Sequence, residues 1–217
     1  MSETLDCEGF SRMLRAGAQS VELAQTTLSE LDSHGGDGDH GITMARAMVL
    51  LRDTIHQARG GSLGKLLYDV GWAIMGVDGG ATGPLFGAFF MGMSQECPEK
   101  GPLNLQCVAK ACNAGLERVR GQTQAQIGDK TLLDALIPAV SALNLAAERG
   151  VKLMEAFQQA AEAASRGAVA TAGLQARFGR AKYVGSQSVG FQDPGAASVA
   201  YLFKGFVEGL DDSVDGA

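Results

Sequence analysis

Three carboxylates gather in one glycine-rich stretch of the chain, residues 31–41. Asp32, Asp37 and Asp39 lie within eight residues of sequence, and because their like charges repel one another, a folded protein needs a reason to bring them together. A hard divalent cation is the usual reason, since Mg²⁺ and Ca²⁺ take oxygen ligands. The intervening glycines let the backbone turn sharply enough to aim the acids at one point. The stretch therefore predicts a metal site, and Mg²⁺, which leaves positions open for phosphate, predicts a phosphate-bearing ligand.

The same stretch could in principle be a plain turn, an EF-hand loop or a Walker-type phosphate loop. Asp-Gly pairs are common in turns, so a solvated turn is the simplest alternative and stays open. An EF-hand loop needs a glycine at its sixth position and a glutamate at its twelfth, whereas counting from Asp32 gives Asp37 and Thr43. A Walker-type phosphate loop is excluded, because no Gly-x4-Gly-Lys-Ser/Thr string occurs in the sequence.

Two further glycine-rich breaks carry groups that bind anions. Residues 77–84 include Thr82 and lead directly into an apolar stretch, and free backbone amides with a hydroxyl at a helix start form an anion site. Residues 179–196 include Arg180, whose guanidinium can contact a phosphate through two parallel hydrogen bonds. Plain turns between helices, with Asp193 as a helix cap in the second break, are the alternative.

A fourth break spans residues 128–134 and includes a lysine. Capping of the following helix by Asp129 or Thr131 is the simplest role for its polar residues. Lys130 could also serve a phosphate as a point charge. Four such breaks in one helical chain are harder to explain as turns alone, and helix starts that converge at one end could hold a polyphosphate between them.

The elements that must position these breaks are helices, because apolar residues recur at spacings of three and four and no sustained alternation occurs. The predicted helices span about residues 6–30, 41–58, 62–77, 83–95, 103–120, 131–149, 151–171 and 194–210. Residues 83–95 are almost wholly apolar, which predicts a helix packed on all sides. The sequence therefore predicts an all-α protein. The irregular stretch 173–193 is long for a connection, and loops of that length are often functional.

Length and charge narrow the class of protein. A chain of 217 residues is long enough for one well-buried domain, predicted to span residues 1–217, and two domains would be cramped. The net charge of −6 and a pI near 5.1 argue against a nucleic-acid partner and against docking on an anionic membrane. The N-terminus lacks the basic and apolar regions of a signal peptide, and no run of about eighteen apolar residues occurs. We therefore expect a cytoplasmic protein.

The cysteines and the third histidine carry no functional signal. The four cysteines form no C-x-x-C pair, so we expect no structural zinc site and interpret them as small buried hydrophobes. They are Cys7, Cys97, Cys107 and Cys112. His34 and His40 flank the acids, whereas His56 lies in a polar helical stretch and is expected at the surface.

The four breaks together resemble the motifs of the L subunit of the dihydroxyacetone kinase family, in the same order along nearly the whole chain. The matching strings are Leu31-Asp32 with Asp37-Gly38-Asp39-His40-Gly41, residues 79–87 (Gly-Gly-Ala-Thr-Gly-Pro-Leu-Phe-Gly), residues 128–131 (Gly-Asp-Lys-Thr), and residues 179–185 with Gln192-Asp193-Pro194-Gly195-Ala196. The resemblance implies a barrel of eight antiparallel helices with a nucleotide at one end.

The resemblance also implies the ligands of this site. Two Mg²⁺ ions would lie between Asp32, Asp37, Asp39 and the phosphates of ADP or ATP. The residues that it assigns to nucleotide contacts or to closing the site are His40, Gly41, Ile42, Thr43, Ala81, Thr82, Gly121, Leu132, Arg180, Asp193, Pro194 and Gly195. No covalent nucleophile or general base is assigned in this chain, because positioning and charge neutralisation carry phosphoryl transfer.

The resemblance implies a partner as well. In this family the ketose is held on a histidine of a separate K subunit, for which a chain of this length has no room, so the chain is expected to be the phosphoryl-donor half of a ketose kinase. A homodimer or hetero-oligomer is expected. The family covers two regimes: a resident nucleotide rephosphorylated by a phosphotransferase-system subunit, or exchange of ATP. Kinases of other short ketoses, such as erythrulose, share this subunit.

Several positions depart from the family pattern. Thr43 stands where Asn is usual, Ala81-Thr82 replaces a small pair that commonly includes Ser, and Phe191 replaces a common His. The metal site survives these changes, whereas the substrate and the partner surface do not follow from the motifs. Two alternatives to the kinase subunit therefore stay open: a non-catalytic nucleotide-binding module that regulates a partner protein, and a structural helical domain with Asp-Gly turns.

Overall fold

Helices make up most of the structure, a computed structural model that describes residues 4–58, 60–98 and 101–211. The α-helices are α1 (Cys7–Leu23), α2 (Gln25–Ser33), α3 (His40–Gln57), α4 (Leu63–Met75), α5 (Thr82–Met93), α6 (Leu105–Arg120), α7 (Leu133–Glu148), α8 (Leu153–Ala170) and α9 (Pro194–Leu210). The 3-10 segments are η1 (Ser94–Glu96), η2 (Thr171–Gly173) and η3 (Arg180–Ser188). Two short strands, β1 (Thr4–Leu5) and β2 (Leu103–Asn104), pair antiparallel. The all-α prediction is confirmed.

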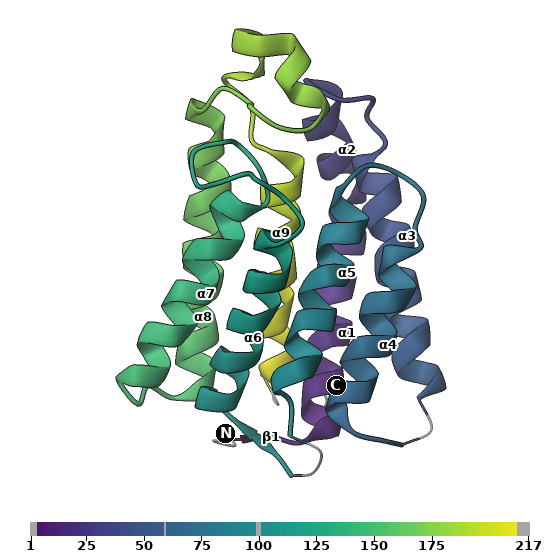
Figure 1. Cartoon of the computed structure of the whole chain (residues 1–217), viewed down its shortest axis with the longest axis vertical. Helices are drawn as coiled ribbons and strands as arrows, with labels where there is room; N and C mark the ends of the chain where they lie inside the picture. The colour runs from purple at the N-terminus through teal and green to yellow at the C-terminus, as the bar shows by residue number, and fades with distance from the viewer. Residues whose placement is uncertain (1–3, 59, 99–100, 212–217) are drawn as a thin grey trace.

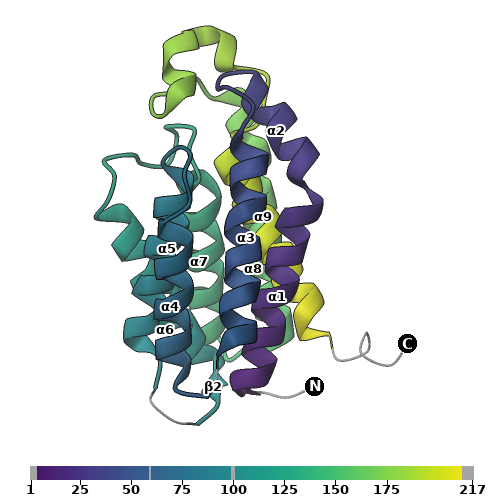
Figure 2. The same ribbon diagram turned by 90° about the vertical axis from the view of Figure 1, so that its right-hand side faces the viewer.

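The long helices pack in a cyclic order. From α3 to α9 each helix packs against the next one along the chain, and α1 packs against both α3 and α9. Neighbours in this order run antiparallel (Figures 1 and 2). The order is consistent with the barrel of antiparallel helices that the family resemblance implies.

Alternation of helix direction brings four connections to one end of the molecule. Residues 34–39, 76–81, 121–132 and 171–193 each follow a helix that runs toward the end opposite β1, at the top of Figure 1. These connections overlap the four glycine-rich breaks of the sequence. The topology of the helices therefore places all four breaks together.

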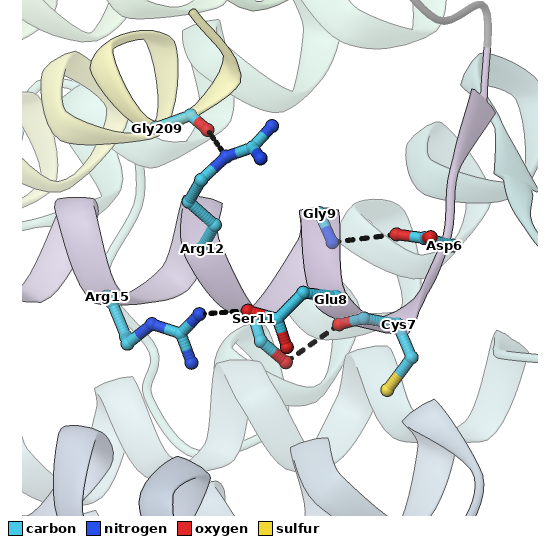
Figure 3. Close-up of polar contacts among 8 residues, drawn as sticks. All are labelled: Asp6, Cys7, Glu8, Gly9, Ser11, Arg12, Arg15 and Gly209. Carbon is cyan, nitrogen blue, oxygen red and sulfur yellow. Dashed lines mark hydrogen bonds and ion pairs between the residues drawn. The ribbon is translucent and has the colours of Figure 1, made fainter. Parts of the chain in front are cut away.

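At the opposite end, polar contacts tie the first helix to the last (Figure 3). Asp6 caps α1 by accepting a hydrogen bond from the backbone N–H of Gly9 at 2.8 Å. The Arg12 Nε donates to the carbonyl oxygen of Gly209 in α9 at 2.9 Å. Both contacts lie at the end away from the four converging connections, and the Arg12 bond serves the packing of α1 against α9.

Close helix packing depends on glycine at several contacts, and the α4–α5 contact is an example. A Cβ atom on Gly71 would lie 2.6 Å from the carbonyl oxygen of Gly87, closer than atoms can approach without a shift. The prediction that residues 83–95 form a helix packed on all sides is confirmed by the burial of most of α5, including Phe90, which is fully buried.

Most predicted helices are found with ends within two residues of those predicted, but the prediction of one helix over 6–30 is wrong. The chain bends at Ala24, whose N–H bonds back to the carbonyl of Val21, and a separate helix α2 follows. Neither proline nor glycine marks this break. The stretch 173–193, predicted to be irregular, contains η3, which bends at Gly185 (φ 57°).

Three expectations from the sequence bear on exposure to solvent or lipid: that the cysteines are buried, that His56 is exposed, and that no helix spans a membrane. Cys7 is exposed, and Cys97 and Cys107 are half-buried, so the prediction of buried cysteines holds only for Cys112. His56 is exposed, as predicted. Across the described ranges, no helix combines the length and apolar character needed to cross a membrane.

Candidate functional site

The three aspartates form a cluster at the end where the connections converge. Asp32 lies in the last turn of α2, Asp37 in the connection that follows, and Asp39 directly before α3. One carboxylate oxygen from each lies within 4.8 Å of those from the other two. Three converging carboxylates are a suitable donor set for a hard cation such as Mg²⁺. The cluster predicted from the sequence is therefore present in the fold.

The backbone of the connection folds around Asp32. Its Oδ2 accepts hydrogen bonds from the backbone N–H groups of Gly38, at 2.9 Å, and His40, at 3.3 Å. A Cβ atom on Gly36 would lie 2.2 Å from Oδ1 of the same carboxylate. A side chain at position 36 would displace this carboxylate, so Gly36 serves the close approach of backbone and Asp32.

Arg180 contacts this cluster from the distant segment η3. Its guanidinium forms ion pairs with Asp37 and, at 3.4 Å, with Asp39. All three side chains are about half exposed, so solvent screens the ion pairs and they stabilise the fold only modestly. Their structural consequence is that a positive charge lies beside the carboxylates.

A cavity of about 280 Å³ lies beside the cluster and is lined by residues of all four connections. Most of the predicted site residues line this cavity. They are Asp32, Asp39, His40, Thr43, Ala81, Thr82, Leu132, Arg180, Asp193, Pro194 and Gly195. Residues predicted from four separate motifs are therefore brought to one place by the fold.

Three predicted nucleotide contacts are not among the lining residues. Gly41 is buried below the cavity, where a Cβ atom would lie 2.0 Å from the carbonyl oxygen of Gln25, so it serves the packing of α3 against α2. Ile42 is 43% exposed on α3. Gly121 is exposed at the end of α6. Asp37 also lies outside the lining, but it belongs to the carboxylate cluster.

Several lining residues were not predicted. Thr123 and Ala125 line the cavity from the connection in which Gly121 was expected to do so. Phe178 and Phe191 contribute aromatic rings, and the Phe191 ring stacks on that of His34 with centroids 3.5 Å apart. The sequence signal for Phe191 was its departure from the family pattern, whereas nothing in the sequence marks Thr123.

His40 is buried and joins α3 to α9. Its Nε2 lies 2.8 Å from the Ser198 Oγ, and the Ser198 hydroxyl donates to the carbonyl oxygen of Pro194. Since a hydroxyl has one hydrogen, Nε2 must be the donor to Ser198. Burial lowers the pKa of His40 to about 4, although Asp32 and the Pro194 carbonyl act in the opposite direction. The ring is therefore neutral at pH 7.

Asp193 caps α9, as the sequence suggested, because its Oδ2 accepts a hydrogen bond from the backbone N–H of Ala196 at 2.7 Å. Burial raises the pKa of Asp193 to about 7, and the Ala196 N–H lowers it. The negative charge of Asp134 raises this pKa further, whereas Lys130 lowers it. This carboxyl group therefore changes its protonation state in the neutral pH range.

The break at 128–134 is organised by a residue that the sequence did not single out as a cap. Asp134 accepts hydrogen bonds from the backbone N–H groups of Gly128, at 2.6 Å, and Thr131, at 2.7 Å. The Asp129 Oδ2 accepts from the N–H of Gln126, so the prediction that Asp129 caps the next helix is wrong. The Thr131 hydroxyl accepts a long bond, 3.3 Å, from the N–H of Leu133.

The start of α5 adds groups that can bind an anion beside the carboxylate cluster. Its first backbone amides have no partner within the helix, and Thr82 in this first turn lines the cavity. At α9, Gly195 also lines the cavity, but the Asp193 carboxylate already caps this helix start. Helix N-termini attract phosphate. The fold and site thus define a helical protein with a cavity that lies between a carboxylate cluster suited to a cation and a helix start suited to an anion.

Comparison with known proteins identifies the family. The family profile described as the DAK2 domain matches residues 34–208, and the chain belongs to this family. It is 34% identical over 177 residues to the Escherichia coli protein named PEP-dependent dihydroxyacetone kinase, ADP-binding subunit DhaL, covering 82% of this chain and 84% of that protein. It is 32% identical over 205 residues to an ADP-binding DhaL subunit of Listeria innocua, covering 94% and 98% of the two chains.

The solved structures that match this chain also belong to a dihydroxyacetone kinase. The chain resembles the crystal structure of the dihydroxyacetone kinase of C. freundii in complex with AMP-PNP and Mg²⁺, with a TM-score of 0.71 and 30% identity. The match covers 91% of this chain and 33% of that one. The native form of the same enzyme matches equally well, over 34% of its length. This chain therefore spans about a third of the C. freundii chain.

Proposed function

We propose that the cavity binds ADP or ATP together with Mg²⁺, and that Asp32, Asp37 and Asp39 hold two metal ions. The observation that carries the proposal is the convergence of three carboxylates, within 4.8 Å of one another, beside a cavity lined by helix starts. Carboxylates alone repel phosphates, so a shared cation is needed to bring the two together. The ligands of the C. freundii complex, AMP-PNP and Mg²⁺, support the same assignment.

Each part of the site then has a role in phosphoryl transfer. The hydrogen bonds from the N–H groups of Gly38 and His40 orient Asp32. The first turn of α5, with the Thr82 hydroxyl, donates to phosphate oxygens, whereas the start of α9 is capped by Asp193. Arg180 adds a positive charge beside the carboxylates. Bound Mg²⁺ supplies neutralisation of the polyphosphate charge, and the protein need not supply a covalent nucleophile.

The reaction we propose is delivery of a phosphoryl group from the bound nucleotide to dihydroxyacetone or a related short ketose held by a separate K subunit. The names of the E. coli and Listeria innocua relatives, ADP-binding subunits of dihydroxyacetone kinases, support this reaction. A relative in Pectobacterium atrosepticum, 35% identical over 188 residues, is named L-erythrulose kinase. Its name supports the proposal that the substrate is a short ketose that need not be dihydroxyacetone. The Lactococcus lactis relative, named PTS-dependent, supports a phosphotransferase-system protein as phosphoryl donor.

The experiment that tests this proposal is identification of a co-purified nucleotide. The chain is purified gently in Mg²⁺ and denatured, and the released small molecules are identified by mass spectrometry. One ADP per chain is the expected result for a resident nucleotide that is rephosphorylated in place. An empty protein that binds MgATP reversibly would instead support nucleotide exchange. A protein that binds no adenine nucleotide in Mg²⁺ would contradict the proposal.

A further inference from the structure

The segment that carries Arg180 is a loop whose two ends lie side by side. We call residues 172–190 the arginine loop; it leaves α8 after Thr171 and returns to α9 through residues 191–193. The backbone N–H of Gly190 donates to the carbonyl of Ala172 at 2.8 Å. The N–H of Asp193 donates to the Thr171 Oγ1 at 2.8 Å. The loop is thus closed at its base by these two hydrogen bonds.

Lys130 reaches the base of this loop from a different connection. Its Nζ donates a hydrogen bond to the carbonyl oxygen of Thr171 at 2.8 Å and another to the carbonyl oxygen of Phe191. One ammonium group therefore bridges the residue before the arginine loop and the residue after it. These bonds use two of its three hydrogens. Lys130 also lines the cavity, so its role as a phosphate-binding charge stays a prediction.

Burying the ammonium group of Lys130 costs free energy, and the surrounding structure must hold the residue in place. Its side chain and backbone are together only 5% exposed, and a buried ammonium must be compensated by hydrogen bonds. Its φ of 61° makes it the one non-glycine residue with positive φ among those that the structure describes. Such a conformation persists only where the surrounding structure requires it, and it often marks a functional region.

The arginine loop is also anchored away from its base. The backbone N–H of Arg177 donates to the carbonyl of Asp129, the neighbour of Lys130, at 3.1 Å. Farther along the loop, Arg180 pairs with Asp37 and Asp39. The connection that contains Lys130 therefore holds the loop at its base and on one side, and the loop in turn places a guanidinium beside the carboxylate cluster.

We infer that Lys130 is a positioning residue that pins both ends of the arginine loop and thereby holds Arg180 beside Asp37 and Asp39. Without the ammonium, the carbonyls of Thr171 and Phe191 lose a shared charged donor and the base of the loop can separate. Lys130 then acts on the nucleotide site through Arg180 rather than by touching a phosphate. The part of this inference that concerns nucleotide rests on the proposed function.

The first test measures opening of the loop without any nucleotide. The loop contains three trypsin sites, Arg177, Arg180 and Lys182. In Lys130→Met, we expect cleavage at these sites under native conditions to be at least about tenfold faster than in the wild type, the effect of losing one charge-assisted hydrogen bond. The matched control is Lys204→Met on α9, whose lysine is exposed, and its loop should be cleaved at the wild-type rate.

Two results would overturn the inference at this stage. One is wild-type protection of the loop in Lys130→Met. The other is a uniform acceleration at sites throughout the chain, which would indicate general destabilisation. Lys130→Gln removes the charge but keeps a polar side chain, so it serves as a second variant if the methionine variant does not fold. Cleavage of its loop at the wild-type rate would also contradict the pinning role, because a neutral amide on a shorter side chain does not replace the ammonium.

The second test asks whether Lys130 acts through Arg180. Release of a fluorescent ADP analogue in Mg²⁺ is measured by stopped flow for Lys130→Met, Arg180→Ala and the double variant. We expect both single variants to release nucleotide faster, and the double variant to release it no faster than Arg180→Ala, because coupled residues are not additive. Additive effects would contradict the inference. Failure of every protein to bind the analogue would contradict the proposed function, while the proteolysis result would still decide the pinning role.

Discussion

At the scale of single residues, the site is built from charges whose surroundings decide what they do. Asp32 accepts two backbone hydrogen bonds and is held in one orientation. Asp37 and Asp39 pair with Arg180. Lys130 has the charge of a phosphate ligand but directs it at two carbonyl groups. Residue type alone therefore does not assign a role at this site.

The assignment of the metal ligands predicts the effect of removing one charge from the cluster. Asp37→Asn keeps the size of the side chain and its exposed position, so the fold should be unchanged by circular dichroism. We expect MgADP affinity, measured by calorimetry, to fall by at least about tenfold, or ~1.4 kcal/mol. Asp53→Asn, at an exposed aspartate of α3, is the control with the same chemistry. Equal affinities in the two variants would contradict the assignment.

Asp193 predicts a pH dependence of stability. Its pKa is raised to about 7, chiefly by burial, so the folded chain holds this proton more tightly than the unfolded chain, in which the pKa is about 4. The stabilisation is therefore complete below about pH 4 and is lost as the pH rises to about 7. Asp193→Asn keeps an acceptor for the helix cap but does not titrate.

The two proteins are compared by urea unfolding at several pH values between about 4 and 7. We expect the free energy of unfolding of the wild type to fall relative to that of Asp193→Asn as the pH rises, by up to about 1.4 kcal/mol per pH unit. The Asn variant shows how all the other titrating groups change the free energy of unfolding with pH. Parallel curves for the two proteins would show that the pKa of Asp193 is not raised.

At the scale of elements, the site depends on where helices end and how closely they pack. The connections that line the cavity are bounded by the ends of helices, so a shift of α4 against α5 would move Ala81 and Thr82. The backbones of these two helices approach each other at Gly71 and Gly87. The glycines of the helices thus set the spacing of elements, whereas the glycines of the connections shape the loops.

This packing predicts the effect of one added methyl group. In Gly71→Ala, the Cβ would lie 2.6 Å from the Gly87 carbonyl oxygen and 2.5 Å from the Met91 Cγ. We expect a loss of about 1–3 kcal/mol in the free energy of unfolding, the usual cost of overpacking. Gly76→Ala, where the nearest atom is the Ala73 oxygen at 3.7 Å, should change stability by less than about 0.5 kcal/mol. Similar losses in both variants would show that close packing at Gly71 is not the cause.

At the scale of the whole molecule, the ligand site joins parts of the chain that are far apart in sequence. Arg180 and Asp39 are 141 residues apart, and His40 and Ser198 are 158 apart. A ligand that contacts all four connections would therefore link α3, α5, α7 and α9 at one end of the helix ring. Binding should stabilise the entire fold rather than a single loop.

This linkage predicts a rise in melting temperature. With MgADP at one hundred times its dissociation constant, a ligand that binds only the folded state stabilises it by about 2.7 kcal/mol, which raises the Tm of a protein of this size by about 5–10 °C. Differential scanning calorimetry measures the shift. A chelator should abolish it, and so should Asp37→Asn. A shift that persists without divalent metal would contradict a metal-dependent nucleotide site.

The sequence by itself determined the helices and the carboxylate cluster, because both are local. Apolar spacing marks each helix, and Asp32, Asp37 and Asp39 need only one tight connection to meet. The bend at Ala24 escaped prediction, since no proline or glycine marks it and the apolar pattern continues through it.

Only the tertiary structure decided which distant residues meet. The alternating directions of the helices place four connections at one end, and the resulting contacts turn Lys130 toward Thr171 and Phe191. They also place Thr123 in the cavity and leave Gly121 outside it. Such contacts join residues with no periodic relation in the sequence, so their partners are set by the packing of whole helices and not by any local preference.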